Sequence, residues 1–157
     1  MKNSLNGKRV AILRPLEQSS HLAVAIEREG GFPIFAPSIE ISLDYDPQEV
    51  ERLFHDLSNG SINYLVFTSS NGVRSFYQIA TELHQVPEIS TSVKIIAVGP
   101  WTADALAERG AVEVSIPKEY SSGGILKMLE RFGLKGRRIA LVRGSRSDNT
   151  LPSSLEA

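Results

Sequence analysis

Small polar residues follow four apolar runs of the sequence, and each polar group precedes a stretch with helical spacing. The apolar runs end at Phe67, Val98, Ile116 and Val142, and the polar groups are residues 68–72, 99–102, 117–124 and 143–145. Backbone N–H groups in the first turn of a helix lack partners within the helix, and the helix dipole adds positive charge there. Such turns can bind carboxylates or phosphates, and serine and threonine hydroxyls add further donors.

Five hydroxyl side chains in these turns are candidates for ligand binding: Ser69, Ser70, Thr102, Ser121 and Ser122. The alternative is that these residues only cap the helices that follow, because serine, threonine and glycine are common at helix ends for that reason alone. The repetition at four turns favours binding, because in a parallel sheet the turns that follow the strands meet at one edge.

Cationic residues lie near the same turns. Arg14 follows the first apolar run, Arg143 and Arg146 flank the last one, and Lys118 is close to the third turn. Arginine binds a carboxylate through two parallel hydrogen bonds, so Arg14 and Arg143 are further candidates for ligand binding. The alternative for each cation is an ordinary solvated surface charge.

The familiar catalytic signatures are absent from the sequence. It has no cysteine, no phosphate loop G-x-x-x-x-G-K-[ST], no dinucleotide motif G-x-G-x-x-G and no metal motif H-E-x-x-H. The three histidines, His21, His55 and His84, are far apart and are expected at the surface rather than as metal ligands. We therefore expect no metal and no organic cofactor, and no catalytic residue can be assigned.

The composition is typical of a globular protein. Of the 157 residues, 41% are hydrophobic and 22% are charged, and 17 Lys and Arg nearly balance 18 Asp and Glu. The net charge of −1 gives no bulk attraction to nucleic acid or to an anionic membrane. No apolar stretch is long enough for a signal peptide or a membrane span. We expect a cytoplasmic monomer that binds a small molecule.

Apolar extended runs alternate with amphipathic stretches, which predicts an α/β fold with parallel strands covered by helices. Strands are expected over residues 10–13, 33–37, 62–67, 93–98, 112–116 and 138–142, and residues 39–43 are a half-exposed strand or a linker. Helices are expected over residues 17–29, 47–57, 71–83, 102–109 and 124–132, with a last helix from about Pro152. Asp46 is placed to cap the helix that starts at Pro47. Because the last helix offers only Leu155 to a core, we expect the chain to be a truncated piece of a larger fold.

Four segments resemble motifs of the uroporphyrinogen-III synthases. Residues 66–73, Val-Phe-Thr-Ser-Ser-Asn-Gly-Val, are similar to the F-T-S motif of that family. Residues 98–106, with Gly110 after them, are similar to its V-G-x-x-T-A-x-x-L…G motif. Leu13-Arg14-Pro15 resembles the R-P after the family's first strand, and Arg143-Gly144 with Leu151, Pro152 and Leu155 resembles its R-G…L-P-x-x-L stretch. The four segments occur in the family's order and cover the whole chain.

The resemblance implies two flavodoxin-like parallel-sheet lobes joined by a two-stranded linker, with the active site between the lobes. Residues 1–37 would form the first half of lobe one, residues 38–45 the linker and residues 46–157 lobe two, and both lobes would be incomplete. A tyrosine that the family uses near the reacting pyrrole would lie beyond Ala157, and Tyr120 does not occupy its place. Trp101 replaces a smaller residue of the family's motif and is expected to pack on the adjoining strand.

The resemblance also implies a reaction. The family's substrate is hydroxymethylbilane, a linear chain of four pyrroles with eight carboxylates, which loses its hydroxyl to give an azafulvene. The last ring is then inverted through a spiro intermediate, and the macrocycle closes as uroporphyrinogen III for haem, sirohaem and cobalamin biosynthesis. Such a lyase needs no cofactor, and the residues expected to bind the substrate are Ser69, Ser70, Thr102, Ser121, Ser122, Arg14 and Arg143.

The chain is expected to be inactive alone, because half of the cleft would be missing. The alternative function is a non-catalytic binding or regulatory module of the same fold. A phosphoacceptor receiver domain is rejected, because the positions of its acidic residues are occupied by Arg14-Pro15 and Thr68-Ser69.

Overall fold

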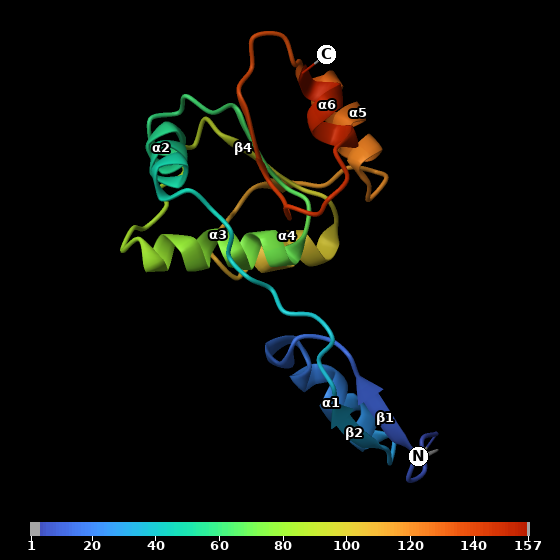
Figure 1. The fold of residues 1–157 in the computed structure, drawn as a ribbon. Helices are drawn as coiled ribbons and strands as arrows, with labels where there is room; N and C mark the ends of the chain where they lie inside the picture. The colour runs from blue at the N-terminus through green and yellow to red at the C-terminus, as the bar shows by residue number, and fades with distance from the viewer. Residues whose placement is uncertain (1–3, 157) are drawn as a thin grey trace. The chain divides into compact units, whose positions relative to one another are not determined.

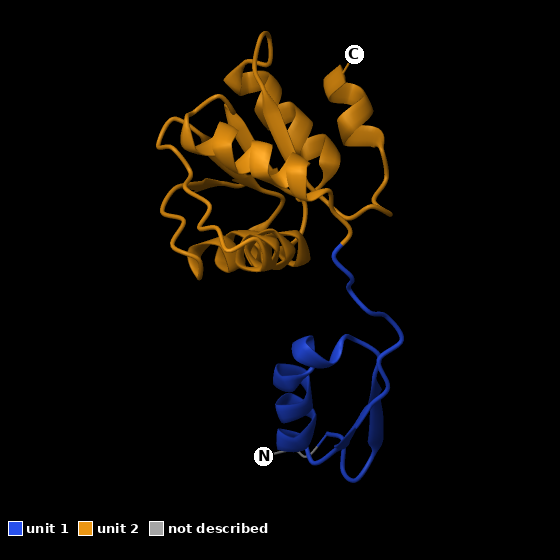
Figure 2. Cartoon of the chain, turned by 60° about the vertical axis from the view of Figure 1, so that its left-hand side comes forward, with its two compact units in different colours: residues 1–43 blue, residues 44–157 orange. Residues whose placement is uncertain are grey.

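The structure is a computed structural model, and it describes residues 4–156. The chain divides into two compact units, one up to residue 43 and one from residue 44, each with its own sheet and core (Figure 2). Strands and helices alternate along both units, and all strand pairs are parallel. The predicted α/β fold class is confirmed.

The first unit consists of two strands and the helical segment that connects them. β1 (Arg9–Ile12) pairs in parallel with β2 (Phe32–Phe35), and the connection holds a short 3-10 helix, η1 (Leu16–Gln18), and α1 (Ser20–Arg28). The sequence predicted a single helix here, but the chain breaks it at Ser19. The buried Ser19 hydroxyl donates to the backbone oxygen of Pro15 at 2.8 Å, and such local bonds compete with regular helix.

The two faces of the β1–β2 sheet differ. Ile12, Ala23 and Ile26 form a small buried core between the sheet and α1. Side chains alternate along a strand, so Phe32 and Ile34 belong to the face away from α1. Phe32 is 61% exposed and Ile34 is 36% exposed, so no described residue covers this apolar face fully.

The second unit is built on a four-stranded parallel sheet with the order β5-β4-β3-β6. β3 (Tyr64–Phe67) and β4 (Lys94–Ala97) are central, and β5 (Val114–Ser115) and β6 (Ile139–Val142) lie outside them. The chain adds β4 and β5 on one side of β3 and then returns to add β6 on the other side. The direction of strand order therefore reverses between β3 and β6.

Helices cover both faces of this sheet (Figure 1). α2 (Pro47–Ser58), α3 (Ser70–Glu82) and α4 (Pro100–Ala107) pack on one face, and α5 (Ser122–Phe132) and α6 (Thr150–Glu156) pack on the other. All four residues of β3 are buried as a result. A continuous apolar run is the expected sequence of a strand that is covered on both faces.

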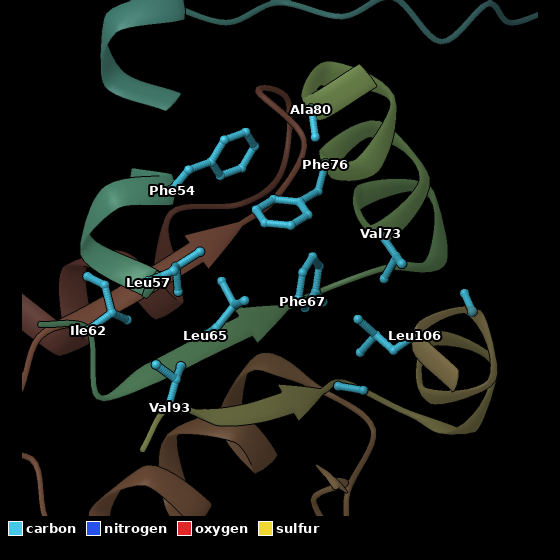
Figure 3. Close-up of a cluster of buried hydrophobic side chains, with 12 residues drawn as sticks. Phe54, Leu57, Ile62, Leu65, Phe67, Val73, Phe76, Ala80, Val93 and Leu106 are labelled. Atoms are coloured by element: carbon cyan, nitrogen blue, oxygen red, sulfur yellow. The ribbon is translucent and has the colours of Figure 1, made fainter. Parts of the chain in front are cut away.

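Aromatic rings form the centre of the larger core (Figure 3). The Phe76 ring contacts the Phe54 and Phe67 rings edge to face, with centroids 5.3 and 5.4 Å apart. Each such pair contributes about 0.5–1.5 kcal/mol beyond the burial of its area. Because Phe67 is the last residue of β3, this packing also fixes the point at which the strand ends and the next turn begins.

Helix starts follow the predicted chemistry closely. The Asp46 carboxylate accepts a hydrogen bond from the backbone N–H of Gln48 at 2.8 Å, so it caps α2 as predicted. α4 begins at Pro100, two residues before the predicted start, because Gly99 is extended and proline suits the first helical position. Residues 39–43 form no strand, so of the two predicted alternatives the structure fits a linker. No helix among residues 4–156 is long and apolar enough to cross a membrane.

Two neighbouring glycines, Gly123 and Gly124, test how closely the first turn of α5 packs against the preceding turn. A Cβ on Gly124 would overlap the backbone oxygen of Glu119, whereas a Cβ on Gly123 would meet only the Ser121 hydroxyl at 3.9 Å. We expect Gly124→Ala to lower the free energy of unfolding by about 1–3 kcal/mol through overpacking. Gly123→Ala should leave it unchanged or raise it by up to about 1 kcal/mol, because alanine favours helix. Urea unfolding measures both, and equal stabilities would contradict the close contact at Gly124.

Candidate functional site

The turns after β3, β4, β5 and β6 lie at one edge of the sheet in the second unit. All four strands are parallel, and the register places Phe67 beside both Ala97 and Val142 at their carboxyl ends. The structure therefore brings the four predicted ligand turns to a common edge. The strand order reverses between β3 and β6, and ligands of open α/β sheets bind in the crevice at such a reversal.

Ser69 and Ser121 cap the helices that follow them. The Ser69 hydroxyl accepts a hydrogen bond from the Gly72 N–H at 3.0 Å, and the Ser121 hydroxyl accepts one from the Gly124 N–H at 3.1 Å. Both serines have the extended backbone of an N-cap residue. Their hydroxyls thus have a structural role, and each retains its own hydrogen to donate to a ligand.

Ser70 and Ser122 are the first residues of α3 and α5 and are half-buried. Among residues 4–156, neither hydroxyl takes part in a hydrogen bond. These two hydroxyls are therefore free to contact a ligand, in contrast to the capping serines directly before them.

Thr102 is a buried polar residue in the first turn of α4, with 3% of its surface exposed. Its backbone N–H donates to the Gly99 oxygen at 3.1 Å. Its hydroxyl forms no hydrogen bond with any residue from 4 to 156, yet no fully buried side-chain oxygen in that range lacks a partner. Oγ1 must therefore reach the surface while the rest of the side chain is buried. This slight exposure makes Thr102 a candidate donor to a ligand.

A small pocket lies where the strand order reverses. Its volume is about 160 Å³, and its polar lining comes from Thr68, Ser122, Arg143, Ser147 and Asp148. The Thr68 hydroxyl donates to the Val142 oxygen at 3.3 Å, which joins the ends of β3 and β6. The pocket is thus lined by residues that follow β3, β5 and β6.

Arg143 is held by the loop before α6. Its guanidinium donates to the Ser147 backbone oxygen and to the Asn149 side chain. Hydrogen bonds from Thr150 lower the pKa of Asp148 in the same loop, and the positive charge of Arg143 lowers it further. The ionised Asp148 partly offsets the charge of Arg143, so this cation is less available to an anion than its sequence position suggested.

The other predicted cations are exposed. Arg14 belongs to the first unit, where its guanidinium donates to the Gln18 side chain at 3.2 Å. Lys118 and Arg146 form no ion pair with any residue from 4 to 156. The three histidines are exposed, and no group of three His, Asp or Glu side chains in the described part of the chain could hold a metal ion.

Two aromatic residues at this edge were not among the predicted binding residues. Trp101 is 83% exposed, so the expectation that it packs on a strand is wrong; Ala105 and Leu106 supply the buried face of α4 instead. Tyr120 is 65% exposed, and its Cγ would lie 3.4 Å from a Cβ placed on Gly99. The available signal was the presence of two large aromatic residues within otherwise small, polar turns.

The second unit is a doubly wound α/β domain, because helices cover both faces of its parallel sheet. Helix starts and hydroxyl side chains lie along the carboxyl edge of that sheet, where such domains bind ligands. Residues 20–157 match the sequence model of the uroporphyrinogen-III synthase HemD family. The chain belongs to this family, as its motifs predicted.

Individual relatives agree with this assignment. A putative uroporphyrinogen-III synthase of Methanothermobacter thermautotrophicus is 26% identical over 147 residues, which cover 94% of this chain and 56% of the relative. The porphyrin biosynthesis protein HemD of Ruminiclostridium josui is 30% identical over 135 residues, which cover 85% of this chain and 26% of the relative. A crystal structure of a mutant uroporphyrinogen III synthase from Thermus thermophilus matches with a TM-score of 0.63 at 22% identity, over 96% of this chain and 57% of that one.

The structural match shows a shared fold. The chain spans little more than half the length of the Methanothermobacter relative and of the Thermus structure, and about a quarter of the Ruminiclostridium protein.

The capping role of Ser121 can be separated from ligand binding. Ser121→Ala removes the acceptor of the Gly124 N–H and should lower the free energy of unfolding by about 1 kcal/mol. Ser122→Ala, one residue further on, removes a hydroxyl without a protein partner and should change it by less than about 0.5 kcal/mol. Urea unfolding of the two variants checks this, and a larger loss for Ser122→Ala would contradict the assigned cap.

Proposed function

We propose that this chain forms part of a uroporphyrinogen-III synthase and that the carboxyl edge of its second unit binds the carboxylate arms of hydroxymethylbilane. Family membership and the names of the relatives support this proposal. The observation that carries it is the convergence of four turns, three of which start α3, α4 and α5, on one edge of one sheet.

Helix starts would allow a nearly neutral protein to bind an anionic substrate. Each one presents unpaired N–H groups and about half a positive charge, without adding to the net charge of −1. In this proposal Thr102, Ser70 and Ser122 donate to carboxylates, and Ser69 and Ser121 hold the helix starts in place and add their own hydrogens. Arg14 and Arg143 are secondary contacts, because both are already bound to neighbouring side chains.

The reaction mainly requires positioning. The hydroxyl of hydroxymethylbilane leaves with a proton as water and gives an azafulvene. The substituted α-carbon of the last ring bonds to the methylene of this azafulvene, which gives the spiro intermediate. The bond between that α-carbon and the bridge to the preceding ring then breaks. The bridge bonds to the free α-carbon of the same ring, and loss of a proton restores the pyrrole. The net change is the loss of one water, so no oxidant or cofactor is needed. Orientation alone contributes about 7–11 kcal/mol to such intramolecular steps.

We also propose how the chain is divided. Residues 1–37 correspond to the first half of lobe one, residues 38–45 to the linker and residues 46–157 to lobe two. The division of the chain into compact units after residue 43 supports this, as does the lack of regular structure between β2 and α2. The proposed enzyme is a cytoplasmic monomer without a nucleic-acid partner.

Activity is measured by supplying hydroxymethylbilane enzymatically and separating the type I and type III isomers after oxidation. Because the chain spans 56% of the Methanothermobacter relative, we expect it to add little type III isomer to the spontaneous type I product. The full-length relative serves as the positive control. Efficient type III formation by this chain would contradict its expected inactivity, whereas tight binding without turnover by either protein would favour the non-catalytic alternative.

Thr102→Val tests the binding edge directly. Valine keeps the shape of threonine and removes a hydroxyl without a protein partner, so stability should hardly change. A hydrogen bond to a charged group contributes about 1.5–3 kcal/mol, so binding of uroporphyrin III, a stable octacarboxylate, should weaken about 10- to 100-fold by calorimetry.

The matched control is Thr81→Val in α3, where the hydroxyl donates to the Tyr77 backbone oxygen at 3.0 Å. This residue precedes the end of α3, away from the helix starts, and its loss should leave binding unchanged. Equal affinities for Thr102→Val and the unmodified chain would remove Thr102 from the site.

A further inference from the structure

Trp101 and Tyr120 are two large aromatic side chains exposed at the edge where the ligand turns meet. They are 83% and 65% exposed, and both come from turns at the carboxyl ends of neighbouring strands, β4 and β5. Single exposed apolar side chains are common on protein surfaces, but two exposed aromatic side chains from neighbouring turns, near hydroxyls without protein partners, point to a ligand. We propose that Trp101 and Tyr120 form an aromatic platform that holds one pyrrole ring of the substrate; this inference rests on the proposed function.

Gly99 lies close to both members of the platform in the chain. The Tyr120 ring rests on its backbone, with Cγ at 3.4 Å and Cδ1 at 3.7 Å from a Cβ built there. Trp101 follows Gly99 by two residues, on the first turn of α4. Both aromatic residues therefore start close to Gly99, and both side chains are largely open to solvent.

The hydroxyl of Thr102 gives the platform a polar neighbour. Thr102 directly follows Trp101, and its Oγ1 reaches the surface from a residue that is otherwise buried. Each pyrrole of the substrate carries carboxylates on short acetate or propionate arms. Trp101 and Thr102 occupy adjacent positions in the first turn of α4, so one helix start would contact both the ring and a carboxylate arm of a substituted pyrrole.

An aromatic platform also suits the chemistry of the ring. Pyrroles are electron-rich and flat and stack on aromatic side chains, and the azafulvene is a cation when protonated. The face of tryptophan attracts cations more strongly than that of any other side chain. The platform therefore acts as a positioning element that selects substituted pyrroles over carboxylates of other shapes.

The platform is tested on the full 157-residue chain with uroporphyrin III as the probe. We expect Trp101→Ala to weaken binding about five-fold by calorimetry, and Trp101→Phe, which retains a ring, to weaken it less than about two-fold. Val112→Ala is the control for loss of exposed apolar surface, because Val112 is 94% exposed and precedes β5 at the opposite edge. This control should bind like the unmodified chain.

Trp101 is the only tryptophan in the sequence, so its fluorescence reports on the platform alone. We expect porphobilinogen, a monopyrrole with two carboxylate arms, to quench this emission in a saturable way. Glutarate, which has two carboxylates and no ring, should not. Quenching by both probes to the same extent would overturn the role of the ring.

These measurements distinguish a failure of the aromatic platform from a failure of the proposed function. If the unmodified chain binds uroporphyrin III and Trp101→Ala binds it equally well, the platform is overturned and the proposed function stands. The platform is likewise overturned if Trp101→Ala changes only the oligomeric state in size-exclusion chromatography, since the aromatic pair would then contact another copy of the chain. If the unmodified chain binds neither pyrrole probe, both the platform and the proposed binding edge are overturned.

Discussion

The pairing of β3 with strands on both of its sides determines the layout of the second unit. β3 bonds in parallel to β4 and β6, and helices bury its two faces. Parallel pairing leaves no choice about where the following turns lie, since every strand must end at the same edge. The core behind that edge is rigid, because Phe67, at the end of β3, packs against Phe76 of α3. The helix starts are thus held in place by apolar packing, and their polar groups remain available for another task.

In the proposed function, this division of roles would let a chain with a net charge of −1 bind a ligand with many carboxylates. Attraction from lysines and arginines would act over a long range and would be screened by salt. Backbone donors act only at short range and in fixed directions, so they select for shape as well as for charge. Arg143 illustrates the difference, because its guanidinium is already bonded to the loop before α6 and lies close to Asp148.

The sequence predicted the order of elements and the convergence of the four turns better than the roles of single residues. Strand and helix periods are local properties, and Asp46 and Pro47 marked the start of α2 correctly. The double role of Ser69, as cap and candidate donor, depends on distances that the sequence does not contain. The exposure of Trp101 depends on which face of α4 the neighbouring residues bury, and the contact of Tyr120 with Gly99 joins two separate turns. These features depend on tertiary contacts, which the spacing of residues in the sequence does not predict.

The small core of the first unit has a consequence for its dynamics. Only Ile12, Ala23 and Ile26 form the buried core among the described residues there, and a sheet of two strands has marginal stability without further packing. Opening this unit exposes little additional apolar surface, so its amide hydrogens should exchange with deuterated water through local fluctuations. The amides of β3, buried beneath two helical layers, exchange only when the whole second unit unfolds. We therefore expect the first unit to open far more readily than the second.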